Sequence, residues 1–346
     1  MTDTTHTEAL TAQPKVAVII LNWNGAALLE EFLPPLLENT DPKLGAIIVA
    51  DNGSSDNSLE LLAEKFPQVE ILKFDRNHGF AEGYNLAVAH YAPRYAYTVL
   101  LNSDATALSP WLQPLVDFMD SHPGYGACQP KLKSYREPDS FEYAGAAGGF
   151  IDRNGFPYCR GRIFDTVEPD HGQYDSVTDL FWATGACLMV RSEVYLKCGG
   201  LDKEFFAHME EIDLCWRMQL AGYKLAVVPE SQVYHLGGGS LDATNPRKTY
   251  LNFRNNLLML HKNLPDSSRR STLLRRRLLD TVAWAKFVAT FDWKNANAIL
   301  KAHRDFAKMS KAYTQHPVAD LLHTRPRRPN ILWQYFGCGR KHFSDL

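Results

Sequence analysis

Short, unbroken apolar segments alternate with helix-like segments through about the first hundred residues, and this alternation restricts the fold more than any other feature. Apolar runs of this length are typical of strands buried on both faces, as in a parallel sheet. The expected strands are residues 16–21, 46–50, 69–74 and 97–101, and the expected helices are residues 26–37, 58–66 and 81–90. The pattern predicts an α/β fold with a mostly parallel, doubly wound, Rossmann-like sheet.

The rest of the chain is less regular. We expect an irregular excursion over residues 134–176 and a strand over 180–191 that is interrupted at Thr184 and Gly185. Further helices are expected at 111–121, 192–198, 211–221, 248–262, 266–291 and 294–313, and a further strand at 225–229. We therefore divide the chain into a flexible N-terminus (1–14), an α/β domain (15–245) and a helical, basic and amphipathic C-terminal region (246–346).

Composition favours a globular protein with a substantial core and excludes few functions. Hydrophobic residues make up 45% and charged residues 22%, and the formal net charge of −2 indicates neither nucleic acid nor membrane as a partner. The N-terminus lacks the basic start and apolar run of a secretory signal, and no apolar stretch reaches the ~18 residues that span a bilayer. Six scattered cysteines without a C-x-x-C pair are typical of reduced thiols, so we expect a cytoplasmic protein.

Polar loops follow each of the first four expected strands. They span residues 22–25, 51–56, 77–80 and 102–104. In a doubly wound sheet ligands bind beyond the carboxyl ends of the strands, so these loops are expected to form one site. Asp51, directly after a buried strand, is a candidate to accept hydrogen bonds from a ligand, with a turn or helix cap as the alternative.

Two further features suit a divalent cation. The triplet Asn102-Ser103-Asp104 ends a hydrophobic strand, and Mg²⁺ or Mn²⁺ is commonly held by one or two carboxylates together with substrate phosphates. An ordinary strand-end turn is the alternative. His235 precedes three glycines that permit close approach of a ligand, and imidazole also binds Mn²⁺, although a lone histidine is more often structural.

The segment FFAHMEEIDLCWRM, residues 205–218, places three carboxylates among large apolar residues. Buried carboxylates are costly unless they are paired or functional. Asp213 and Arg217 are four residues apart on one helix face, which favours an ion pair. Glu210 and Glu211 point about 100° apart on a helix, so they cannot face one substrate atom in the same way. Either glutamate is then a candidate general base.

The order and spacing of these motifs resemble a known family over about residues 15–255. The motifs are VAVIILNWNG, VADNGSSDNS, NHGFAEGYN, LLNSDA, WATGACLMVRSEVY and GGLDKEFFAHMEEIDLCWRMQLAGYKLAVVPESQVYHLGGGS. The chain resembles family 2 inverting glycosyltransferases with the GT-A fold, and most resembles the rhamnosyltransferase-like branch that builds bacterial surface polysaccharide. Residues 15–245 would then be the catalytic domain.

The resemblance implies a role for each motif residue. Asn22 and Asp51 would hold the base and ribose of a nucleotide sugar, while Asn77 and Gly79, with Asn85 behind them, would shape its pocket. Asn102 would contact ribose or diphosphate, and Asp104 would bind the donor through a Mg²⁺ or Mn²⁺ ion that His235 also holds. The donor sugar and acceptor pocket would be lined by Gly185 and Ala186.

The family's catalytic base is the aspartate of an E-D pair, which reads Glu210-Glu211 here. The resemblance therefore implies Glu211 as the base, with Glu210 as the second candidate. The implied reaction moves a sugar from a nucleotide-diphosphate sugar, with dTDP-rhamnose suggested by the branch, to a hydroxyl of a glycan or lipid-linked acceptor. A nucleotide-sugar-binding module without transfer activity is the alternative. A dinucleotide-dependent oxidoreductase is rejected, because G-x-G-x-x-G is absent after the first strand.

The expected C-terminal helices combine arginines with apolar and aromatic side chains, which suits an anionic membrane interface. The arginines are Arg269, Arg270, Arg275, Arg276 and Arg277, and the aromatic residues include Trp284, Phe287 and Phe291. We expect peripheral contact with the inner face of the cytoplasmic membrane. A helical cap with a solvated basic face and a homodimer contact remain alternatives.

Overall fold

The computed structural model describes residues 13–237, 245–323 and 328–346, so the expected flexible N-terminus lies almost entirely outside the described residues. The strands are β1 (Val16–Asn22), β2 (Gly45–Asp51), β3 (Glu70–Lys73), β4 (Tyr97–Leu101), β5 (Ala105–Thr106), β6 (Tyr125–Ser134), β7 (Gly149–Ile151), β8 (Pro157–Cys159), β9 (Arg162–Ile163), β10 (Thr166–Val167), β11 (Thr178–Asp179), β12 (Cys187–Arg191) and β13 (Lys224–His235). The α-helices are α1 (Ala26–Glu38), α2 (Ser58–Lys65), α3 (Phe80–Tyr91), α4 (Leu112–Ser121), α5 (Ser192–Lys197), α6 (Glu210–Leu220), α7 (Pro246–Asn263), α8 (Asp266–Ala289) and α9 (Trp293–Met309).

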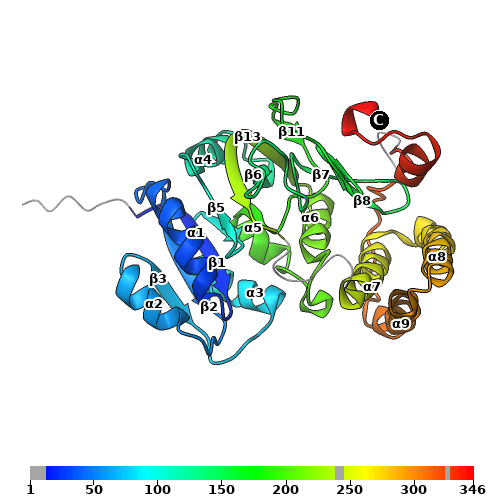
Figure 1. Cartoon of the computed structure of the whole chain (residues 1–346), viewed down its shortest axis with the longest axis horizontal. Coiled ribbons are helices and arrows are strands. Elements are labelled where there is room, and N and C mark those ends of the chain that lie inside the picture. The colour runs from blue at the N-terminus through cyan, green and yellow to red at the C-terminus, as the bar shows by residue number, and fades with distance from the viewer. Residues whose placement is uncertain (1–12, 238–244, 324–327) are drawn as a thin grey trace, which may run out of the picture.

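The central sheet has the strand order β11-β13-β6-β12-β4-β1-β2-β3, with β5 paired to β13. The pairs β3–β2, β2–β1, β1–β4 and β6–β13 are parallel, whereas β12 is antiparallel to both of its neighbours. The expected mixed α/β architecture with a mostly parallel sheet is confirmed. Figure 1 shows this sheet in the middle of the molecule, with α7, α8 and α9 gathered beside α6 and away from β3.

Alternate side chains of β1 enter different hydrophobic clusters, which explains its unbroken apolar sequence. Val16, Val18 and Ile20 join a cluster that contains residues of α1 and α4, whereas Ala17 and Ile19 join a cluster with residues of α3 and α6. The strand is thus buried on both faces, as its composition predicts. The polar loops that follow β1, β2 and β4 therefore lie at the same edge of the sheet, beyond the carboxyl ends of these strands.

Two expectations for the middle of the chain are wrong. Residues 134–176 contain a separate antiparallel sheet of order β10-β9-β8-β7, rather than only irregular structure. Its strands are two or three residues long, too short to show a periodic pattern. The strand expected over 180–191 is confined to β12. Leu180 instead continues the pairing of β11 with β13 by donating its N–H to the Leu225 carbonyl, and Thr184 donates its N–H to the Gln129 side chain.

Strand β13 is longer than the 225–229 that its apolar residues indicate. A register shift between Val228 and Gln232 interrupts its pairing with β6, and the strand then continues to His235. His235 pairs with Ala105 of β5, one residue after Asp104. The extension of β13 therefore places His235 close to the segment that follows β4. Gly238 and Gly239 of the expected glycine triplet lie outside the described residues.

The C-terminal helices pack against the α/β part. Leu257, Leu258 and Leu260 of α7 belong to the same buried cluster as residues of α3 and α6. In contrast, the buried residues of α8 are polar or charged, namely Thr272, Arg276 and Asp280. Within the described ranges, no helix is long and apolar enough to cross a membrane. The division of the chain at residue 245 stays a prediction.

Candidate active site

The ends of β1 and β2 carry a buried pair of polar side chains. Asn22 and Asp51 are opposite one another in the sheet register, and Asn22 Nδ2 donates to Asp51 Oδ1 over 3.2 Å. Asn22 also donates to Ser54 Oγ over 3.2 Å, while Asp51 Oδ2 accepts from the Ser54 N–H over 3.1 Å. Both Asn22 and Asp51 are fully buried. Their hydrogen bonds to Ser54 hold the loop 51–56 in place, at the position expected for the nucleotide.

A second amide, Asn52, organises the loop before α3. Its Nδ2 donates to Asn77 Oδ1 and to the Gly79 carbonyl, both over 3.1 Å, and its Oδ1 accepts from the His78 N–H over 2.9 Å. Gly79 has φ +80°, a left-handed conformation that favours glycine, and a Cβ there would meet open space. Asn77 and Gly79 thus lie together beside Asp51. Sequence reasoning assigned no role to Asn52, although it follows Asp51 directly.

The expected metal ligands also come together. His235 Nε2 lies 3.0 Å from Asp104 Oδ1 and 3.3 Å from Asn102 Nδ2. On the other side of the ring, His235 Nδ1 lies 3.4 Å from Glu142 Oε1. Burial alone would lower the pKa of His235, but Asp104 and Glu142 together raise it to about 10. Burial likewise opposes ionisation of Asp104, but the hydrogen bond and charge of His235 lower the pKa of Asp104 below its ordinary value.

This set of side chains fits a hard divalent cation. A carboxylate and an imidazole nitrogen 3.0 Å apart can share one ion once the ion displaces the proton that Asp104 and Glu142 favour on the ring, and Glu142 is placed to orient the ring through its other nitrogen. Among the described residues, no group of three or more His, Cys, Asp or Glu side chains is arranged to hold a metal ion. Two protein ligands leave positions for substrate phosphate oxygens, as Mg²⁺ and Mn²⁺ sites commonly do.

One hydrogen bond joins this end of the site to the turn before β12. The Asn102 N–H donates to the Ala186 carbonyl over 3.0 Å. A Cβ built on the adjacent Gly185 would lie 3.6 Å from Glu211 Cβ and 3.7 Å from Glu211 Cγ, so Gly185 directly faces Glu211. Because Gly185 has no side chain, no atom stands at that Cβ position beside Glu211. Gly185, Ala186 and Glu211 therefore belong to one site with Asn102.

Glu210 and Glu211 begin α6 after a left-handed residue, Met209, with φ 74°. Glu210 is only 5% exposed, whereas Glu211 is partly exposed. Burial raises the pKa of Glu211 to about 7, although backbone N–H groups at the helix start oppose the rise. Burial and the neighbouring charge of Glu211 hold the pKa of Glu210 well above its ordinary value. In the described structure, one carboxylate oxygen of each glutamate is buried without a hydrogen-bond partner.

The third carboxylate of this segment is paired, as the sequence predicts. Asp213 is fully buried and accepts from Arg217 Nε over 2.8 Å, which confirms the expected ion pair. It also accepts from Lys262 Nζ over 2.9 Å and from Asn263 Nδ2 over 2.7 Å, both on α7. Asn85, expected behind the nucleotide pocket, instead bonds both the N–H and the carbonyl of Leu201. It braces the chain that leads into α6.

Glu142 is the site residue that the sequence did not reveal. It lies in the segment expected to be irregular and belongs to none of the recognisable motifs. The Glu142 N–H donates to the Leu132 carbonyl of β6, over 3.0 Å, and this bond carries the side chain to His235. Only the paired strands β6 and β13 bring these distant residues together.

Comparison with known proteins identifies related sequences. The chain is 26% identical over 241 residues to the N-acetylglucosaminyl-diphospho-decaprenol L-rhamnosyltransferase of Mycobacterium tuberculosis (strain ATCC 25618 / H37Rv), which covers 63% of this chain and 75% of the relative. It is 27% identical over 214 residues to Rhamnosyltransferase WbbL of Escherichia coli (strain K12), which covers 60% of this chain and 79% of the relative.

Solved structures share the fold at low sequence identity. TarS 1-349 of S. aureus in complex with UDP-GlcNAc superposes with a TM-score of 0.57 at 14% identity, covering 86% of this chain and 83% of that chain. GalNAc-T7 with UDP, GalNAc and Mn2+ gives 0.59 at 14% identity, covering 88% of this chain and 58% of the longer GalNAc-T7 chain. At such identities the likeness concerns the fold, and it confirms the expected GT-A architecture.

Residues 17–176 match the sequence profile of Glycosyl transferase family 2. These residues include the loops that follow β1, β2 and β4, and the loop before α3. The expected resemblance is therefore confirmed: the chain carries a glycosyl transferase family 2 domain on a GT-A fold.

Proposed function

We propose that this chain is an inverting glycosyltransferase that moves a sugar from a nucleotide-diphosphate sugar to a hydroxyl of a glycan or lipid-linked acceptor in cell-surface polysaccharide synthesis. The observation that carries the proposal is the juxtaposition of Glu211 with Gly185, which the Asn102–Ala186 hydrogen bond ties to Asp104 and His235. The names of the two rhamnosyltransferase relatives support rhamnose as the transferred sugar, and the diphospho-decaprenol named for one supports a lipid-linked acceptor.

In the proposed reaction Glu211 accepts the proton of the acceptor hydroxyl. The hydroxyl oxygen forms a bond to the anomeric carbon while the bond from that carbon to the diphosphate breaks, so the configuration inverts. A carboxylate with a pKa of about 7 is suited to this role, because general bases work best when their pKa is near the working pH. Burial of Glu210 and the partial exposure of Glu211 favour Glu211 over Glu210 as the proton acceptor.

Asp104 and His235 would hold a Mg²⁺ or Mn²⁺ ion, with Glu142 orienting the imidazole. Such an ion supplies charge stabilisation for a leaving diphosphate. Asn22 and Asp51 would position the base and ribose from the neighbouring strand ends, and Asn77 and Gly79 would shape the same pocket. The Mn²⁺ present in the GalNAc-T7 structure supports a divalent cofactor for this fold.

A screen of nucleotide sugars tests the function directly. Each candidate donor is assayed for stabilisation of the purified protein against heat in the presence of Mn²⁺, and each hit is then assayed for hydrolysis and for transfer to a hydroxyl acceptor. We expect a deoxysugar donor such as dTDP-rhamnose to stabilise the wild type and to be turned over. Binding without hydrolysis or transfer would instead support the alternative of a nucleotide-sugar-binding module, for which the comparisons give no support.

Peripheral contact with an anionic membrane is the second part of the proposal. Leu274, Leu278 and Val282 are 62%, 61% and 68% exposed at intervals of four residues on α8, so they form one apolar stripe. Exposed Arg270 and Arg277 lie on the same helix, and basic side chains beside an apolar stripe suit an anionic interface. Arg276, by contrast, is buried: its guanidinium lies 3.7 Å from the Phe156 ring centroid and it pairs with Asp280 over 2.8 Å.

Vesicle flotation tests this contact, and the location of Arg276 dictates the variant. Replacing Leu274, Leu278 and Val282 with serine removes the stripe without touching the buried pair. We expect the wild type to float with vesicles rich in anionic lipid, and the triple variant to remain in the soluble fraction. Concentration-dependent dimerisation that the triple variant abolishes, without vesicle binding by the wild type, would assign the stripe to a homodimer contact instead.

A further inference from the structure

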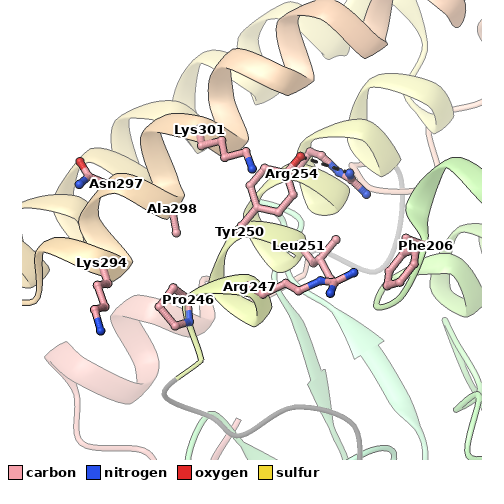
Figure 2. A pocket seen from close by; sticks show the side chains of 10 residues that line it. All are labelled: Phe206, Pro246, Arg247, Tyr250, Leu251, Arg254, Lys294, Asn297, Ala298 and Lys301. Atoms are coloured by element: carbon pink, nitrogen blue, oxygen red, sulfur yellow. Dashed lines mark hydrogen bonds between the residues drawn. The ribbon is translucent and has the colours of Figure 1, made fainter.

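A cavity of about 690 Å³ lies between the N-terminal parts of α7 and α9. Its wall combines basic and aromatic side chains: Phe206, Arg247, Tyr250, Arg254, Lys294 and Lys301. Figure 2 shows the Lys301 ammonium group above the Tyr250 ring and the Arg247 side chain directed toward Phe206. The roles assigned above to the strand ends and to α6 use none of these residues.

Carboxylates of the described residues do not neutralise three of the basic side chains in this groove. Within residues 13–237, 245–323 and 328–346, Arg247, Lys294 and Lys301 form no ion pair with a carboxylate. Arg247 and Lys301 instead lie over aromatic rings, 4.7 Å from the Phe206 centroid and 4.8 Å from the Tyr250 centroid. A contact with an aromatic ring does not neutralise a cation, so the Arg247 and Lys301 charges remain available to an anion.

The nearby carboxylates are engaged in structural contacts. Asp292 accepts from the backbone and side chain of Asn295 and so caps α9, although its charge also acts on Lys294. Asp305 accepts from the Tyr250 hydroxyl over 3.0 Å. Arg254 is the most constrained cation of the groove, because it donates to the carbonyls of Glu204 and Phe205. Arg247 and Lys301 remain as the freest donors to a ligand.

An exposed apolar feature adjoins the cationic groove. Phe291 and Trp293 are 78% and 56% exposed, their ring centroids lie 6.5 Å apart, and they immediately precede Lys294. Large exposed aromatic side chains beside a cluster of cations suit a ligand that joins an anion to an apolar chain. Neither a free nucleotide nor a neutral glycan has that combination.

The groove is also fastened to the segment that carries Glu211. Phe206 lies five residues before Glu211, and Asn255 on α7 donates to the carbonyls of Phe205, Ala207 and His208 over 2.7 to 2.9 Å. We propose that this groove binds the diphosphate of an amphiphilic lipid-diphosphate acceptor, with the lipid chain leaving past Phe291 and Trp293. The proposal rests on the proposed transferase function, and it assigns the acceptor's anion to a surface distinct from the donor's.

Direct binding tests the groove independently of transfer. Inorganic pyrophosphate and geranyl diphosphate are titrated calorimetrically into the full chain that has been saturated with Mn²⁺ and a nucleoside diphosphate, so that the donor site is filled. We expect both probes to bind, with geranyl diphosphate the tighter of the two, and uncharged geraniol to bind far more weakly. Lys301→Glu and Arg247→Glu should each weaken binding by about tenfold or more, as expected when a charge-assisted contact to a phosphate is replaced by repulsion.

Matched variants separate the possible outcomes. Lys308→Glu makes the same charge change at an exposed position of α9 outside the groove and should bind both probes like the wild type. Trp293→Ser should remove the advantage of geranyl diphosphate over pyrophosphate. Equal losses in Lys308→Glu and Lys301→Glu would overturn the proposal, since they indicate an effect of net charge alone. Competition between the nucleoside diphosphate and pyrophosphate for the groove would also overturn it, because the groove would then serve the donor.

Kinetics with two acceptors complete the test. For a sugar linked to a prenyl diphosphate, Lys301→Glu should raise KM about tenfold or more with little change in kcat, whereas a sugar on an uncharged alkyl chain should show no such rise in KM. Failure of the proposed function itself would look different: the wild type would turn over no nucleotide sugar, yet the pyrophosphate titration would still report on the groove. Equal KM increases for both acceptors would refute diphosphate recognition.

Discussion

Replacement of Glu211 with glutamine tests the central chemical assignment. The substitution keeps the size of the side chain but removes its ability to accept a proton. Because a positioned general base typically contributes ~10²–10⁴-fold, we expect transfer to fall by about that factor. Donor binding should survive, since Asn22, Asp51 and Asp104 stand at the strand ends and not on α6. Transfer assays and donor titrations on the same preparation measure both quantities.

The burial of Glu211 also predicts how the wild type responds to pH. Its pKa is raised to about 7, and only the deprotonated carboxylate can accept the acceptor's proton. The value of kcat/KM should therefore rise with pH, by about tenfold between pH 6 and pH 8, if one group governs that limb. The residual activity of Glu211→Gln should not show this rise of kcat/KM with pH. A wild-type profile that is flat across this range would refute the assignment.

The same raised pKa has a consequence for stability, with a definite sign. The ordinary pKa is 4.5, so the unfolded chain loses this proton at lower pH than the folded protein does. The stability contributed by the protonated form is present below pH 4.5 and is lost as pH rises to about 7. At pH 8 the buried charge would cost up to about 3 kcal/mol. Glu211→Gln should thus be more stable than the wild type at pH 8 but not at pH 4, as measured by urea unfolding.

Glu210→Gln is the matched control for these measurements. Glu210 is 5% exposed, and burial with the neighbouring Glu211 charge raises its pKa and favours the neutral form, which glutamine imitates. We expect Glu210→Gln to retain most of the transfer activity. If Glu210→Gln loses transfer while Glu211→Gln keeps it, the base is Glu210 and the roles assigned to the two glutamates are reversed.

Three further predictions concern the metal, the fold and the donor loop. Asp104→Asn should weaken Mn²⁺-dependent binding of a nucleotide sugar by about tenfold or more, and an unchanged calorimetric titration would contradict the role of Asp104. Asp213→Ala should lower the free energy of unfolding in urea by about 3 kcal/mol, because Arg217 and Lys262 lose a fully buried counter-charge. Gly79→Ala should cost about 1–3 kcal/mol, because φ 80° with ψ −179° lies in a backbone region essentially restricted to glycine, although no atom lies within 4 Å of the added Cβ.

Much of the proposed donor-binding half of the site could be predicted from sequence, because local sequence patterns determine where its residues lie. The apolar runs that become β1, β2 and β4 are buried on both faces, and parallel strands must bring the loops at their carboxyl ends to one edge. The contact of Asn22 with Asp51, and the contact of Asn77 with the adjacent Asn52, therefore follow without any knowledge of distant contacts. The Asp213–Arg217 pair was predictable for the same reason, since the spacing of a helix alone aligns it.

The features that escaped prediction depend on contacts between distant segments. Glu142 reaches His235 only because β6 and β13 pair, and no local pattern marks it. The small sheet from β7 to β10 has strands too short to alternate visibly. On α8 the arginines look alike in sequence, but Arg276 is buried against Phe156 and Asp280 whereas Arg277 is exposed. Which arginine faces solvent is decided by the segments packed against α8, namely Phe156 between β7 and β8 and Asn256 of α7.

The three carboxylates at the start of α6 have different neighbours, and these neighbours explain the different role assigned to each carboxylate. Asp213 meets two cations and an amide, so burial is compensated and the charge is retained. Glu210 meets no cation in the ion pairs of the described chain, and burial favours its neutral form. Glu211 lies beside Gly185, and in the proposed reaction its carboxylate accepts the proton of the acceptor hydroxyl. Since Lys262 and Asn263 belong to α7, the C-terminal helices supply the contacts that let an acidic helix start stay buried beside the site.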